Sequence, residues 1–139
     1  MLQKLNIRRG GFTLVEIMIV VAIIALLATF GIPSLMRARK TAQATACKND
    51  IALVDKAMQQ WAAEKNKKNG DTPVWTDLKP YMNETSRLGL AATCTDSLGS
   101  TITIPALGTP LTVPTATYSA LSDVQGADFW SPYAPAAAQ

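Results

Sequence analysis

The sequence predicts an α+β protein, in which a long N-terminal α-helix is followed by a small C-terminal head. Three observations carry this prediction: twenty residues without a charge at 17–36, an apolar stripe of helical spacing after them, and short β-prone runs beyond residue 99. A chain of 139 residues has room for one domain. Charged residues make up 17%, below the roughly 25% of soluble domains. Residues 17–36 are uncharged and apolar almost throughout, so a wholly soluble globule is excluded.

The first element is an apolar helix long enough to cross a membrane. From Phe12 to Met36, 25 residues would form about 37 Å of helix, against about 30 Å of bilayer hydrocarbon. Arg8 and Arg9 precede it, which favours a cytoplasmic N-terminus and a head on the outer side. Basic residues on the far side weaken that preference; they are Arg37, Arg39 and Lys40. A secretory signal peptide would need a shorter apolar run, with a small-residue cleavage site close behind it.

Glu16 is the residue that a simple membrane anchor does not explain. A carboxylate within a span costs several kcal/mol, about 2–3 at the helix centre and less near an end. The run from Ile17 to Met36 holds no basic residue to pair with it. Cleavage between Gly11 and Phe12 would create an α-amine. That amine could pair with Glu16 of a second, axially offset helix and set the register of assembly.

The residues around this position carry a resemblance to a known family. The run Arg8-Arg9-Gly10-Gly11-Phe12-Thr13-Leu14-Val15-Glu16, followed by about twenty apolar residues, resembles the processing site of type IV prepilins and type II secretion pseudopilins. The resemblance implies a leader of residues 1–11, cut after Gly11 by a prepilin peptidase. It also implies N-methylation of Phe12 and an assembly role for Glu16. The expected fold is then type IV pilin-like, with its helix kinked near Pro33.

A helix over residues 37–69 is expected to continue beyond the membrane segment of residues 12–36. Gly31 and Pro33 should kink or loosen the chain between the two, because Pro33 lacks an N–H and clashes with the preceding turn. An apolar stripe at steps of three and four predicts a core face; its members are Cys47, Ile51, Val54, Met58 and Trp61. Gly70 is the expected residue after the helix end.

The head, residues 70–139, is expected to contain one short helix and a few antiparallel strands. Residues 72–82 read as a turn and a short helix, with Trp75, Leu78 and Tyr81 as its anchors. Three β-prone runs are separated by prolines, so the strands must be short; they are Thr101–Ile104, Leu111–Val113 and Thr115–Tyr118. The Ala/Pro-rich tail, residues 130–139, is expected to be poorly ordered at its end.

The remaining candidate chemistry is sparse. Cys47 and Cys94 could form a disulfide in an oxidising compartment, the alternative being a buried free thiol at Cys47. Asp96, Asp123 and Asp128 could ligate calcium, but solvated loop carboxylates are the favoured interpretation and no metal site is predicted. The sequence has no His and shows no nucleophile–base pair, so neither enzyme activity nor a cofactor is predicted.

The sequence therefore predicts a structural subunit of a pilus-like filament, most closely a type II secretion pseudopilin. The alternatives are a type IV pilus pilin, a minor pilin whose head binds a surface or DNA, and an anchored domain that never assembles. Expected partners are copies of itself, related pilins, the prepilin peptidase, an inner-membrane assembly platform and, before assembly, the lipid bilayer. Nucleic acid is not a favoured partner, since residues 37–68 carry net +5 but residues 69–139 carry net −4. The expected location is the bacterial inner membrane, with the head in the periplasm, and then the filament.

Overall fold

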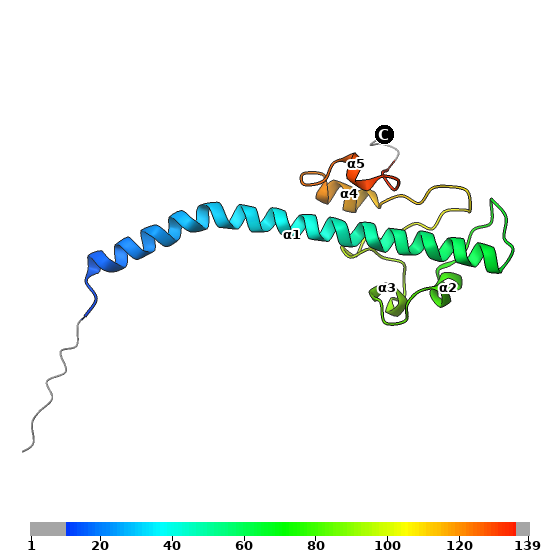
Figure 1. Cartoon of the computed structure of the whole chain (residues 1–139), viewed down its shortest axis with the longest axis horizontal. Coiled ribbons are helices and arrows are strands. Elements are labelled where there is room, and N and C mark those ends of the chain that lie inside the picture. The colour runs from blue at the N-terminus through cyan, green and yellow to red at the C-terminus, as the bar shows by residue number, and fades with distance from the viewer. Residues whose placement is uncertain (1–10, 136–139) are drawn as a thin grey trace, which may run out of the picture. The chain divides into compact units, whose positions relative to one another are not determined.

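A computed structural model describes residues 11–135 and shows one long helix followed by short ones (Figure 1). The chain divides into two compact units, residues 1–36 and residues 37–139, and each is described here by itself. In chain order the elements are α1 (Leu14–Glu64), α2 (Trp75–Leu78), η1 (Lys79–Tyr81), α3 (Arg87–Leu90), α4 (Thr115–Leu121) and α5 (Ala127–Trp130).

The described part of the first unit is the apolar half of α1. The helix begins at Leu14, and every residue from Ile17 to Met36 except Ala28 is exposed. In water such a surface would be costly, at about 25 cal/mol per Å² of apolar area. The side chains that normally form a core are therefore left uncovered, as expected of a segment whose surroundings are lipid or other helices.

The second half of α1 supplies the core face of the second unit, as the stripe predicts. All five members of the stripe are buried, and Ala44 and Ala57 extend it by one turn and fill its middle. In Figure 1, α2 and α3 lie on one side of this part of α1, and α4 and α5 lie on the other. Leu78, Leu88, Leu121 and Trp130 come from these four short helices, and each is at most 1% exposed. Short helices thus cover the stripe where a sheet was predicted.

The end of α1 comes earlier than Gly70, the position expected from the sequence. The last helical residue is Glu64, and Asn66 adopts a left-handed conformation with φ 50°. The Lys67 N–H donates to the Ala62 carbonyl at 2.9 Å, which closes the helix with a Schellman-type bond. Asparagine tolerates the left-handed region better than most residues, so it can take the place of glycine at this position. Gly70 lies further along, in the turn that follows, with φ 101°.

The prediction of antiparallel strands is wrong for residues 11–135. The only bridge there is an isolated antiparallel pair between Thr95 and Thr101, and Thr115–Tyr118 is the start of α4. Prolines explain the outcome: Pro105 and Pro110 remove ladder donors, and Pro114 occupies the N-cap of α4. These runs still alternate between buried and exposed side chains, as strands do, although they form no sheet. Ile102, Leu111 and Val113 are buried, and the threonines between them are exposed.

The short helix predicted within residues 72–82 is confirmed. Leu78 is fully buried, while Trp75 and Tyr81 are half-buried against the core. The beginning of the tail packs against the rest of the unit: Trp130 is fully buried, and the Val113 N–H donates to the Tyr133 carbonyl at 2.8 Å. The predicted disorder at residues 136–139 lies outside the described residues, as do residues 1–10 of the predicted leader.

Candidate functional site

The N-terminal turn of α1 contains the residues predicted to be processed and to drive assembly. Gly11 and Phe12 lie in non-helical chain directly before the helix and are exposed. A Cβ added at Gly11 would meet no atom within 4 Å, so no packing in the structure shields this peptide bond. A protease could therefore reach the bond after Gly11 without unfolding the helix. Arg8, Arg9 and Gly10 of the predicted recognition sequence lie outside the described residues.

Glu16 has a partner within its own chain that the sequence prediction did not identify. Thr13 is the residue before the helix, and its Oγ1 accepts from the Glu16 N–H at 3.2 Å. In return the Thr13 N–H donates to Glu16 Oε2 at 3.4 Å. This reciprocal pair is a capping box, and its Thr-x-x-Glu signature before an apolar run was available in the sequence. Both bonds are long and exposed, so the carboxylate keeps capacity for a further donor.

The surface that follows Glu16 is continuous and apolar. Of the helices in residues 11–135, α1 is the only one long and apolar enough to cross a membrane, and none of its most apolar window is buried. Thr29 is a polar exception, and its Oγ1 donates to the Ala25 carbonyl at 2.9 Å, so the hydroxyl is satisfied inside the helix. A surface of this kind can pack against lipid or against the same surface of another copy.

Gly31 and Pro33 lie within α1, and the helix continues through both residues without a break. A Cβ at Gly31 would meet no atom within 4 Å, so packing inside the unit does not demand glycine there. Pro33 has no N–H to donate to the Thr29 carbonyl, four residues earlier. The kink predicted at these two residues therefore stays a prediction, with one missing helical hydrogen bond as its physical basis.

Polar contacts within the second unit hold α3 and the turn after α4 against α1. Lys40 Nζ lies 2.6 Å from Asp123 Oδ2, and this ion pair keeps the pKa of Asp123 below its ordinary value. Arg87 lies 2.7 Å from Asp50 Oδ2 and also donates to the Thr95 carbonyl at 2.7 Å. Burial raises the pKa of Asp50, and the Arg87 hydrogen bond opposes that rise. Sequence patterns alone could not have found these pairs, because 37 and 83 positions separate their members.

Asp96 does not behave as the solvated carboxylate expected from the sequence. It is 1% exposed and accepts from the N–H groups of Leu98 at 3.0 Å and Ser100 at 2.9 Å. The Thr117 hydroxyl, from α4, donates to its other oxygen. Asp96 thus links the loop after the Thr95 bridge to α4. Within residues 11–135 no group of three or more acidic or sulfur ligands could hold a metal ion, so Asp96, Asp123 and Asp128 are not brought together.

Both cysteines are free, buried thiols in the structure, so the predicted disulfide is not formed in it. The Cys47 sulfur instead lies 2.9 Å from Ser97 Oγ. Burial raises the pKa of both thiols, that of Cys94 to about 12. The buried free thiol at Cys47 is the state described here. Pairing of Cys47 with Cys94 in an oxidising compartment stays a prediction, which peptide mapping without reductant would test.

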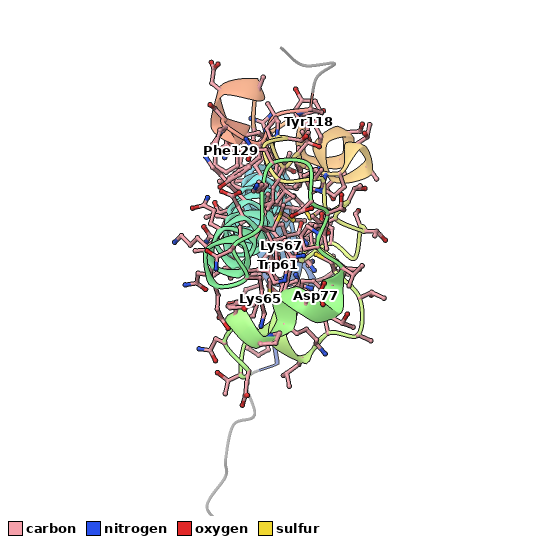
Figure 2. All side chains as sticks on the ribbon, turned by 90° about the vertical axis from the view of Figure 1, so that its right-hand side faces the viewer. Trp61, Lys65, Lys67, Asp77, Tyr118 and Phe129 are labelled. Atoms are coloured by element: carbon pink, nitrogen blue, oxygen red, sulfur yellow. The ribbon has the colours of Figure 1, made fainter. Side chains whose placement is uncertain are left out.

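The head offers little surface for stacking a nucleic-acid base. Every aromatic side chain from Trp61 to Tyr133 is buried or half-buried. Figure 2 shows Trp61 and Lys67 together, and the Lys67 ammonium lies 5.4 Å from the centre of the Trp61 ring. Phe129 is approached in the same way by Lys48, at 5.0 Å. Two lysines are therefore engaged with aromatic rings inside the unit, rather than forming a free basic and aromatic surface with them.

Comparison with known proteins finds a family match at the N-terminus and two relatives. Residues 6–32 match the family described as "Prokaryotic N-terminal methylation motif". The type IV major pilin protein PilA of Myxococcus xanthus (strain DK1622) is 34% identical over 65 residues, 47% of this chain and 30% of the relative. The type II secretion system core protein G of Aeromonas hydrophila is 32% identical over 60 residues, 43% of this chain and 42% of the relative. The matches thus span less than half of each relative, and no solved structure matches the chain.

Proposed function

We propose that this chain, whose residues 6–32 carry the prokaryotic N-terminal methylation motif, is a structural subunit of a type IV pilus-like filament. Within that class, its proposed role is that of a type II secretion pseudopilin. The subunit assembles through the apolar half of α1 after its leader is removed. Its role is structural rather than catalytic, and the proposal requires no cofactor.

One observation carries this proposal: the matched motif coincides with a helix whose apolar side chains are exposed over twenty residues. A leader motif alone would fit any processed membrane protein, and an exposed apolar helix alone would fit any anchor. Their coincidence, with Glu16 belonging to both the motif and the helix, fits a helix that leaves the bilayer to pack against copies of itself. The relatives support it, since one is a type IV pilin and the other a type II secretion protein.

The proposed sequence of events starts in the bacterial inner membrane. The chain inserts with its N-terminus in the cytoplasm and its head in the periplasm. A prepilin peptidase cleaves after Gly11, and Phe12 becomes the N-methylated first residue. An inner-membrane assembly platform then draws subunits into a fibre, with the apolar helices inside and the heads outside. The Glu16 carboxylate forms an ion pair with the Phe12 α-amine of a neighbouring subunit, and this pair sets the axial register.

The second candidate function is that of a type IV pilus pilin or minor pilin with an adhesive or DNA-binding head. The similarity to the Myxococcus major pilin supports the pilus itself. The buried and half-buried aromatic side chains of the head give no support to DNA binding through stacking. Deleting the gene separates the two roles, because a pseudopilin is needed for protein secretion and a pilin for surface fibres.

Processing is tested by intact-mass analysis of the chain extracted from membranes of its native host. The expected product is residues 12–139 with one added methyl group. Gly11→Val should block cleavage, because the family peptidase accepts only a very small residue there. Gly31→Val is the matched control: its added side chain also meets open space, and cleavage should proceed. Mature protein that retains Gly11 would contradict the proposal.

Assembly is tested by isolating sheared fibres from cells that hold the complete host machinery. The parent chain should be present in fibres as well as in the membrane fraction. If it never enters fibres under these conditions, the chain is an anchored domain that does not assemble, and the filament proposal fails.

A further inference from the structure

Three basic residues follow the apolar span directly, and neither the fold nor the proposed assembly uses all of them. Arg37, Arg39 and Lys40 begin the second half of α1, immediately after Met36. They lie on the side of the membrane where the positive-inside preference disfavours basic residues. Basic residues on that side would be stabilised by a local partner of negative charge.

Within residues 11–135 Lys40 has an ion-pair partner and the two arginines have none, although the charge of Arg37 also helps to keep the pKa of Asp123 low. Lys40 is half-buried and pairs with Asp123 at 2.6 Å, so its charge is used inside the second unit. Arg37 and Arg39 are both exposed, and neither has an ion-pair partner within residues 11–135. At 3.6 residues per turn, side chains two positions apart project about 160° apart around a helix. The two guanidinium groups therefore lie on nearly opposite sides of the helix, so each would bind a separate small anion.

The spacing of charges along α1 puts Arg37 at a membrane surface. Twenty uncharged residues, 17–36, separate Glu16 from Arg37. As α-helix they measure about 30 Å, which is the thickness of the hydrocarbon core of a bilayer. When these residues fill the core, Glu16 lies at one boundary and Arg37 at the other. The long arginine side chain then extends among the headgroups, where the available anions are phosphates.

We propose that Arg37 and Arg39 bind the headgroup phosphates of anionic phospholipids at the C-terminal end of the span. The planar guanidinium donates two parallel hydrogen bonds to a phosphate, which an ammonium cannot do. The interaction fixes how deeply the unassembled subunit lies in the bilayer, while Lys40 holds the head through Asp123. It rests on the proposed membrane-inserted state that precedes assembly.

A second copy of the chain is the competing partner for the arginines, because residues 69–139 carry net −4. Position favours the lipid. The arginines adjoin the span itself, so headgroups surround them in every inserted subunit, whereas an acidic neighbour is present only in a fibre. The two partners can be distinguished by removing the arginines. If they bind lipid, lipid binding is weakened; if they bind a second copy, contacts between subunits are weakened.

The test uses the full-length chain in neutral detergent micelles, with native mass spectrometry to count retained phospholipids. Phosphatidylglycerol is the anionic probe and phosphatidylcholine is the zwitterionic one. Arg37→Gln with Arg39→Gln removes two exposed charges next to the span. Lys56→Gln with Lys68→Gln is the matched control, since both lysines are exposed, lie far along the chain from the span, and have no ion pair or aromatic contact within residues 11–135. Circular dichroism checks that both variants keep their helix content.

We expect the parent and the lysine control to retain phosphatidylglycerol in preference to phosphatidylcholine. Loss of both arginines should weaken that retention about 25-fold, from roughly five-fold for each basic residue near a lipid surface. Arg37→Lys with Arg39→Lys should recover part of it, because the charge remains and only the two-pronged bonding is lost. Equal retention by the parent and the glutamine variant would overturn the proposal.

The same glutamine variant separates this inference from the filament proposal. Lipid retention is measured on unassembled chain, so a chain that never forms fibres can still give the expected result. If the variant keeps its lipids but yields fewer crosslinks between subunits in fibres, the arginines bind a second copy. That outcome would overturn the lipid assignment and leave the filament proposal intact.

Discussion

Glu16 has two possible roles, and the substitution Glu16→Gln separates them. As the third residue of α1 it closes a capping box with Thr13. In the proposed filament it also carries the charge that pairs with the Phe12 amine of a neighbour. Glutamine keeps a carbonyl oxygen that can accept from the Thr13 N–H, and capping boxes use either residue. It lacks the charge. Leucine removes both functions, and Thr13→Ala removes the cap alone.

The two roles differ in size by enough to be measured. The capping bonds are 3.2 and 3.4 Å long and exposed, so losing them should cost the lower end of the usual range, about 0.5–1 kcal/mol. An amine left unpaired in an apolar filament core costs about 3–5 kcal/mol. Since each 1.4 kcal/mol is a factor of about ten, the critical concentration for assembly should rise roughly 100-fold to several thousand-fold.

The assay compares fibre yield with the membrane level of each variant in cells that hold the host machinery. We expect Glu16→Gln and Glu16→Leu to be cleaved, to accumulate in the membrane, and to form little or no fibre. Thr13→Ala should lower the yield only several-fold, in line with about 1 kcal/mol of capping energy. Co-expression of Glu16→Leu with the parent should reduce assembly of the mixture.

The reverse pattern would refute the reasoning. If Glu16→Gln assembles as well as the parent while Thr13→Ala does not, Glu16 acts as a helix cap, and a charge pair does not set the register. Normal fibres from Glu16→Leu would exclude both roles.

Three further predictions concern the second unit. Asp96→Ala should lower the free energy of unfolding by about 3 kcal/mol, because three donors lose a buried acceptor; denaturant titration in detergent measures it. Arg87→Met should lower the free energy of unfolding by about 1 kcal/mol at neutral pH, a value that allows for solvent screening of this partly exposed pair. That loss should shrink as pH falls through the raised folded-state pKa of Asp50, since the protonated carboxyl needs no partner. Iodoacetamide at pH 8 should modify Cys47 and Cys94 much more slowly in reduced, folded chain than after unfolding, because burial raises both thiol pKa values.

The first of these has a control within the chain, and each has an outcome that would contradict it. Asp128→Ala removes an exposed carboxylate and should change stability by less than about 0.5 kcal/mol. An Asp96→Ala loss no larger than that of Asp128→Ala would show that the buried contacts contribute little. A constant Arg87→Met loss from neutral to acidic pH would place its effect in the Thr95 carbonyl bond instead of the Asp50 pair. Rapid labelling of Cys94 in folded chain would contradict its burial.

Features that depend on neighbours along the chain follow from the amino-acid sequence alone. The uncharged run 17–36, the Thr13–Glu16 cap and the stripe from Cys47 to Trp61 are periodic or local patterns, and helix geometry converts them directly into faces and ends. The short helix around Leu78 is predictable for the same reason. The N-terminal helix is therefore largely encoded in local sequence, and its capping box, although absent from the prediction, has a local signature as well.

Features that join distant residues depend instead on tertiary packing. The β-prone run from Thr115 forms α4 because Pro114 starts a helix and Thr117 bonds to Asp96, an acceptor 21 residues away. Asp96 has the local sequence context of an exposed loop carboxylate. Its burial depends on how the later part of the chain, including α4, packs over it. The partners of Lys40 and Arg87 are equally distant. Pairing across such separations is set by packing against α1, which local propensity does not encode.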